Sequence, residues 1–157
     1  MPNQPSADLD LVVLGGGGHV GLPLSLAFAQ AGLRVGIYDI SQSTLDRIAS
    51  GDMPFMENGA DALLTELIPT GRLAFSADAS IIGRTNQLIV VIGTPVDEFL
   101  GPSMTVFERA VEQISPHLRD DALVVLRSTV YPGTTANVTF QRSRTACQPS
   151  RPEATAS

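Results

Sequence analysis

The chain has 157 residues, a formal net charge of −6 and 43% hydrophobic residues, values typical of one globular domain with its own core. The negative charge argues against nucleic acid or an anionic membrane as a partner, and no apolar run approaches the ~18 residues of a membrane span. All ten basic residues are arginine, which excludes the catalytic lysine of short-chain dehydrogenases and the lysine of nucleoside-triphosphatase phosphate loops.

The first half of the chain carries a strand, a glycine turn, a helix and a second strand. The first strand is predicted over Asp10–Leu14, the helix over Val20–Ala31, and the second strand over Arg34–Asp39, where it ends on a carboxylate. This order is the dinucleotide-binding fingerprint in its required context.

Only one register of the four consecutive glycines fits the G-x-G-x-x-G pattern. It is Gly16-x-Gly18-x-x-Gly21, because starting at Gly15 would place Val20 at the third glycine position. We expect Gly16 to make the tight turn and Gly18 to let a pyrophosphate approach the backbone. Gly21 is expected to let the helix pack closely on the strand.

The residues around this turn define the predicted ligand. Backbone N–H groups near His19 and Val20, at the start of the helix, are expected to point at phosphates. Asp39 would accept hydrogen bonds from two ribose hydroxyls, and its charge would repel a 2′-phosphate. Ile40 and Ser41 follow, with no arginine to hold that phosphate, so the sequence predicts NAD rather than NADP.

The rest of the chain alternates helix and strand signals, which predicts a parallel sheet covered on both faces. Either Ser41 or Ser43 caps a helix that reaches Ser50. The further predicted elements are a helix over 60–68, a strand over 73–75, a brief helix over 76–83, a strand over 88–92, a helix over 105–118 and a strand over 122–126.

The two later strands end in polar turns. Thr94 and Pro95 follow the fourth strand, and Ser128, Thr129 and Val130 follow the fifth. Taken singly, Thr94 or Ser128 is a loop residue that satisfies its own backbone. Their shared position at the carboxyl ends of strands, where open parallel sheets bind ligands, favours cofactor contact.

Five stretches resemble the NAD-binding domain of the UDP-glucose/GDP-mannose dehydrogenases. They are residues 16–24, 50–57, 71–73, 93–98 and 128–135, in the family's order. The resemblance implies a Rossmann-type doubly wound sheet and an enzyme of polysaccharide biosynthesis that oxidises the CH–OH group of a UDP-sugar to the uronic acid. It implies NAD contacts at the glycine turn and at Asp39, Thr94, Pro95, Ser128, Thr129 and Val130. The segments 55–57 and 127–130 look most like the branch that includes UDP-N-acetylmannosamine dehydrogenases, and His19 replaces the family's usual tyrosine.

The C-terminal stretch departs from the family pattern. We expect a disordered N-terminus over 1–8, an NAD-binding domain over 9–140 and a disordered tail over 141–157, with the last strand of the sheet and the downstream domains lacking. The resemblance places the catalytic cysteine and lysine in those later domains. Cys147, the single cysteine, lies in the polar tail and is not expected to be the nucleophile. With no disulfide and no signal-peptide pattern, a cytoplasmic location is expected.

Three functional interpretations remain open. The favoured one is the NAD-binding piece of a nucleotide-sugar dehydrogenase, without turnover of its own, that meets the nucleotide sugar only when the missing domains are supplied. The others are a non-catalytic NAD-binding module and a non-functional truncated remnant. The apolar fifth strand also predicts self-association through an exposed sheet edge.

Overall fold

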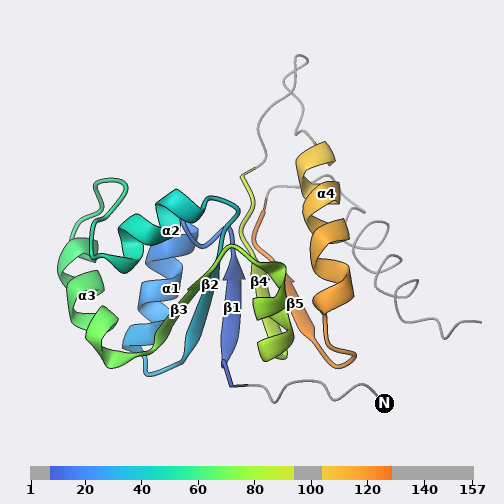
Figure 1. Ribbon diagram of the computed structural model, residues 1–157, viewed down its shortest axis with the longest axis horizontal. Helices are drawn as coiled ribbons and strands as arrows, with labels where there is room; N and C mark the ends of the chain where they lie inside the picture. The colour runs from blue at the N-terminus through green and yellow to red at the C-terminus, as the bar shows by residue number, and fades with distance from the viewer. Residues whose placement is uncertain (1–7, 94–103, 129–157) are drawn as a thin grey trace, which may run out of the picture.

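A five-stranded parallel sheet forms the centre of the computed structural model, which describes residues 8–93 and 104–128 (Figure 1). The strands are β1 (Leu11–Leu14), β2 (Val35–Tyr38), β3 (Leu73–Ser76), β4 (Gln87–Val90) and β5 (Leu123–Leu126). Their order is β3-β2-β1-β4-β5, so the chain reverses direction across the sheet beside β1. The predicted Rossmann-type doubly wound sheet is confirmed.

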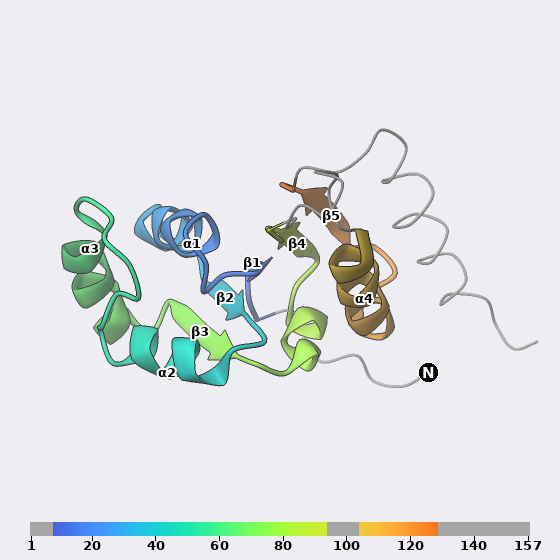
Figure 2. The same cartoon turned by 90° about the horizontal axis from the view of Figure 1, so that it is seen from above.

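Helices lie on both sides of the sheet, as the view from above shows (Figure 2). The elements α1 (Gly21–Gln30), α2 (Gln42–Ala49) and α3 (Ala60–Leu67) pack on one face. The 3₁₀ helix η2 (Ala79–Arg84) and α4 (Met104–Ile114) pack on the other. At 11 residues, α4 is the longest of these helices, and nothing in the described ranges is both long and apolar enough to cross a bilayer.

The alternation of side chains along β1 divides the core in two. Val13 joins Leu22 of α1 in the first core cluster, whereas Val12 joins Phe107 of α4 in the second. All four side chains are fully buried, and burial of each such side chain contributes about 1.5–3 kcal/mol. The two clusters therefore fix both helical layers to the same central strand.

Prolines explain two of the helix ends that come earlier than predicted. The helix expected over 105–118 stops at Ile114 and continues as the 3₁₀ helix η3 (Ser115–His117), because Pro116 has no N–H to donate to the preceding turn. Pro69 acts in the same way after α3, within the 3₁₀ helix η1 (Ile68–Thr70). The other boundaries agree with the predictions to within three residues, the usual uncertainty of element ends.

Ser41 is the N-cap of α2, which settles the choice between Ser41 and Ser43. The Ser41 hydroxyl accepts a hydrogen bond from the Thr44 N–H at 3.3 Å. Within the described ranges, the hydrogen bond of the Ser43 hydroxyl is with that of Ser41, at 3.2 Å. The cap leaves the start of α2 fixed directly after the end of β2.

Strand β5 is covered on one face only, within the described part of the chain. Val124 and Leu126 pack against the second core cluster, but Leu123 and Val125 are 60% and 43% exposed on the opposite face. The predicted cover on both faces is found for β1 to β4, whereas the described residues cover β5 on one face. Among the described residues, the first helical layer packs on β1, β2 and β3 and on Ile89 of β4, and it does not reach β5.

Candidate cofactor site

The turn after β1 is built from backbone contacts that only glycine allows. Gly15, with φ of +77°, adopts the left-handed conformation. Both residues donate N–H hydrogen bonds to the Tyr38 carbonyl oxygen, at 2.9 and 3.1 Å. A Cβ on Gly16 would lie 2.7 Å from the Cγ2 atom of Ile37, so Gly16 serves close packing against β2.

Gly18 and Gly21 differ in what they would meet as alanine. A Cβ on Gly21 would lie 2.1 Å from the Gly15 carbonyl oxygen, so α1 packs closely on the turn at the end of β1 rather than on the strand itself. A Cβ on Gly18 would have only that same oxygen nearby, at an ordinary 3.4 Å. The described protein does not require glycine at position 18, and the open space there fits a ligand that approaches the backbone.

Three consecutive backbone N–H groups follow the glycines and have no acceptor among the described residues. They belong to His19, Val20 and Gly21. They stand at the N-terminus of the ten-residue helix α1, where the helix dipole favours a negative charge. This arrangement fits a phosphate group, and the predicted contact of these N–H groups with the cofactor stays a prediction.

The Asp39 carboxylate closes the other side of the turn. Its Oδ2 atom accepts the Gly17 N–H and its Oδ1 atom the Ser41 N–H, both at 3.1 Å. Each carboxylate oxygen has a further lone pair, so Asp39 can still accept hydrogen bonds from ribose hydroxyls. Ile40, directly after it, is 81% exposed and offers no cationic group.

The carboxyl ends of β1, β4 and β5 meet at one edge of the sheet. The Ser128 hydroxyl accepts the Ile92 N–H at 2.9 Å and donates to the Val90 carbonyl oxygen at 3.4 Å, which joins the ends of β4 and β5. The glycine turn adjoins the end of β4, since a Cβ on Gly15 would lie 1.9 Å from the Val91 carbonyl oxygen. Ser128 therefore satisfies neighbouring backbone, and its predicted contact with the cofactor stays a prediction. The other predicted residues of these turns lie outside the described residues: Thr94, Pro95, Thr129 and Val130.

One contact at the site involves Phe55, which is not among the predicted cofactor-binding residues. The imidazole ring of His19 stacks on the ring of Phe55, with centroids 4.1 Å apart and planes at 19°. Phe55 is half-buried and also packs against the first core cluster. The loop between α2 and α3 is thereby joined to the phosphate-facing turn.

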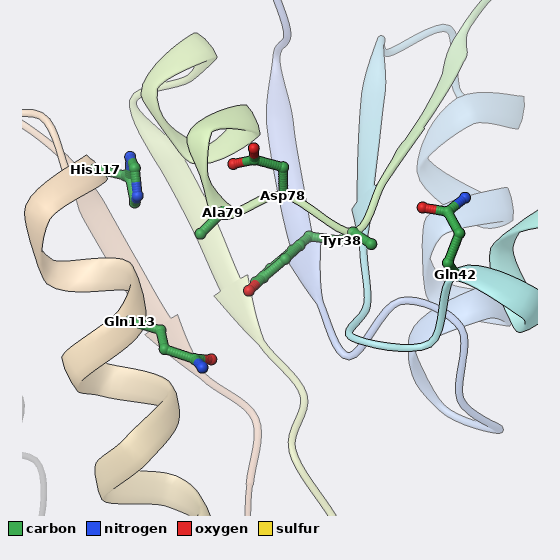
Figure 3. Close-up of a pocket in the computed structure, with 7 residues that line it drawn as sticks. Tyr38, Gln42, Asp78, Ala79, Gln113 and His117 are labelled. Atoms are coloured by element: carbon green, nitrogen blue, oxygen red, sulfur yellow. The ribbon is translucent and has the colours of Figure 1, made fainter.

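A polar hollow of about 590 Å³ opens beside the site, on the α4 side of the sheet. Figure 3 shows Tyr38 and Asp78 opposite Gln113 and His117; Gln42, Ala77 and Ala79 complete its lining. Burial, with the Asp78 and Asp39 carboxylates, raises the pKa of the Tyr38 hydroxyl. Hydrogen bonding by Ser80 lowers the pKa of Asp78, and His117 adds to that effect. At neutral pH the hollow therefore presents a neutral hydroxyl and a carboxylate.

A family model matches most of the chain. It is that of the UDP-glucose/GDP-mannose dehydrogenase family, NAD binding domain, and it matches residues 10–152. The predicted family resemblance and the predicted cofactor, NAD, are both confirmed by this match.

Individual relatives agree with the family model. The UDP-N-acetyl-D-glucosamine 6-dehydrogenase of Pseudomonas aeruginosa is 34% identical over 128 residues, which are 82% of this chain and 29% of that protein. The UDP-N-acetyl-D-mannosamine dehydrogenase of Pyrococcus horikoshii is 32% identical over 118 residues, 75% of this chain and 28% of its own length.

Solved structures extend the comparison to three dimensions. The GDP-mannose dehydrogenase of Pseudomonas aeruginosa superposes with a TM-score of 0.81 at 27% identity, over 88% of this chain and 32% of that one. The chain thus spans less than a third of the length of these relatives. Their names include several different nucleotide sugars, so the predicted branch within the family stays a prediction.

Proposed function

Because the chain belongs to the UDP-glucose/GDP-mannose dehydrogenase family, we propose that it supplies the cofactor-binding domain of a nucleotide-sugar dehydrogenase. In that reaction NAD accepts hydride from the CH–OH group of a UDP-sugar on its way to the uronic acid. The observation that carries the proposal is the row of three N–H groups at the start of α1 that have no acceptor in the described part of the chain, beside the Asp39 carboxylate.

Each part of the cofactor has a proposed partner in this arrangement. The pyrophosphate binds the N–H groups of His19, Val20 and Gly21, over the open backbone of Gly18. The adenosine ribose donates its hydroxyls to Asp39, whose charge repels the extra phosphate of NADP. Thr94, Pro95, Ser128, Thr129 and Val130 are proposed to contact the remainder of NAD from the ends of β4 and β5.

The proposed role of these 157 residues is binding without turnover. The family resemblance assigns the nucleophilic cysteine and the catalytic lysine to later domains, and this sequence has no lysine. The nucleotide sugar is proposed to bind only in the presence of those domains. A cytoplasmic location, expected from the sequence, stays a prediction, and self-association through β5 is proposed from the exposure of Leu123 and Val125.

The decisive experiment is a calorimetric titration of the chain and of an Asp39→Asn variant with NAD and with NADP. Asp39 also holds the turn through Gly17 and Ser41, so the substitution loosens the site for both cofactors alike. The ratio of the two affinities isolates the contact with the ribose. We expect the unsubstituted chain to prefer NAD by tenfold or more and the variant to lose most of that preference, since hydrogen bonds to a charged group contribute about 1.5–3 kcal/mol.

Asp46→Asn is the matched control, because Asp46 is an exposed carboxylate on α2 that bonds Gln42. It should leave both affinities unchanged. Absence of saturable NAD binding by a folded chain, or the same NAD preference in the Asp39→Asn variant, would contradict the proposal.

A further inference from the structure

The ring stack between His19 and Phe55 joins the glycine-rich turn to a residue that packs on the core. His19 is exposed and follows four consecutive glycines, the residues with the greatest backbone freedom. Phe55 is half-buried and packs against the first core cluster. The stack at 4.1 Å therefore restrains His19 relative to the core.

This restraint acts at the first of the three unpaired donors. The backbone N–H of His19 begins the row that continues through Val20 and Gly21. On the opposite side of the turn, Asp39 holds the Gly17 N–H at 3.1 Å. The turn is thus held from two sides, by a carboxylate at Gly17 and by an aromatic ring at His19.

We propose that Phe55 is a positioning residue for the phosphate-facing turn: through its stack on the His19 ring it holds the backbone N–H groups of His19 and Val20 in the orientation that an anion requires, and so sets the affinity for NAD. The inference rests on the proposed function of the turn. Its physical basis is preorganisation, since a donor already held in place loses less freedom when the ligand binds. Phe55 itself touches no part of the cofactor in this scheme.

The test is a double-mutant cycle on NAD affinity with Phe55→Leu and His19→Ala. Leucine keeps apolar volume against the core but removes the ring that stacks. Loss of an aromatic pair of this kind corresponds to a roughly two- to tenfold increase in the dissociation constant, if the whole pair energy is transmitted to binding. We expect each single variant to weaken NAD binding by that factor and the double variant to weaken it no further. His19→Tyr, which restores a ring on the same backbone, should recover the affinity.

A second readout needs no cofactor. The Gly17 and Gly18 N–H groups are hydrogen-bonded inside the turn, to Asp39 and to the Gly15 carbonyl oxygen. Loss of the stack should speed hydrogen exchange at these two amides in both single variants, while exchange in the core of β1 stays the same. Met56→Ala is the control, because Met56 adjoins Phe55 in the same loop and is 99% exposed; it should change neither readout.

Additive losses of affinity in the double variant, or unchanged exchange at Gly17 and Gly18, would overturn the inference. So would failure of His19→Tyr to restore binding. If the unsubstituted chain binds no NAD, the proposed function fails by itself, and the exchange measurement still decides whether the stack positions the turn.

Discussion

At the scale of single residues, the glycines of the turn separate into two kinds. Gly15, Gly16 and Gly21 are required by the protein itself, because a Cβ on each would lie under 3.0 Å from a backbone atom of the chain. Gly18 is not, since its nearest neighbour would be at 3.4 Å. A glycine that the fold does not need, beside three unpaired donors, is most simply explained by a ligand.

Alanine at position 21 should therefore lower stability, whereas alanine at position 18 should weaken NAD binding. Gly21→Ala is expected to lower the free energy of unfolding by about 3 kcal/mol or more, because the methyl group would overlap the Gly15 carbonyl oxygen. Gly18→Ala should leave that free energy within about 1 kcal/mol yet weaken NAD binding at least tenfold. Chemical denaturation and calorimetry measure the two quantities. Equal stability losses in both variants would mean that position 18 is a packing position after all.

At the scale of secondary-structure elements, the N-cap Ser41 fixes the first turn of α2 directly beside the site. Ser41 uses its hydroxyl for the Thr44 N–H and its own backbone N–H for Asp39. The two bonds couple the start of α2 to the carboxylate proposed to hold the ribose. The helix and the site thus share one residue.

Ser41→Ala should lower the free energy of unfolding by about 1 kcal/mol, the usual loss when a capping hydroxyl is removed. The backbone bond to Asp39 needs no side chain and should persist. Ser43→Ala is the matched control, two residues further along the chain, and should have a much smaller effect. Denaturant titrations of both variants check the difference, and a larger loss at Ser43 would contradict the assignment of the cap.

Much of this element order could be predicted from the sequence, and some of the site could not. Apolar runs, capping residues and glycines marked the strands and helices, and their alternation predicted the parallel sheet. The left-handed residue could not be chosen among four glycines, because each can adopt that conformation. The stack of His19 on Phe55 joins residues 36 positions apart in the chain, and no spacing rule connects a turn before α1 to a loop after α2.

At the scale of the whole molecule, the helical layers cover the sheet unequally. The first layer stops short of β5, which leaves Leu123 and Val125 exposed within the described part of the chain. Exposed apolar strands at a sheet edge are templates for pairing with another chain. This asymmetry is the basis of the proposed self-association.

A lysine at position 125 should reduce self-association, because a charge on an outer strand opposes pairing. Light scattering over a range of concentrations should show a lower average mass for Val125→Lys than for the unsubstituted chain. Val106→Lys is matched in exposure, since both valines are 43% exposed, but lies on α4 and should have no effect. A monomeric unsubstituted chain at all concentrations would refute the proposed association.

The completed hydrogen bonding of the glycine turn has a consequence for how a ligand enters and leaves. Gly15, Gly16, Gly17 and Gly18 each donate to an acceptor within the protein. Ordering the backbone of each residue costs roughly 1–2 kcal/mol of conformational entropy. Because the turn is already ordered in the folded protein, this entropy is lost during folding and not when a ligand binds. We therefore expect the turn to be a rigid binding site. A bound ligand would replace water at the three N–H groups, and its release would leave the conformation of the turn unchanged.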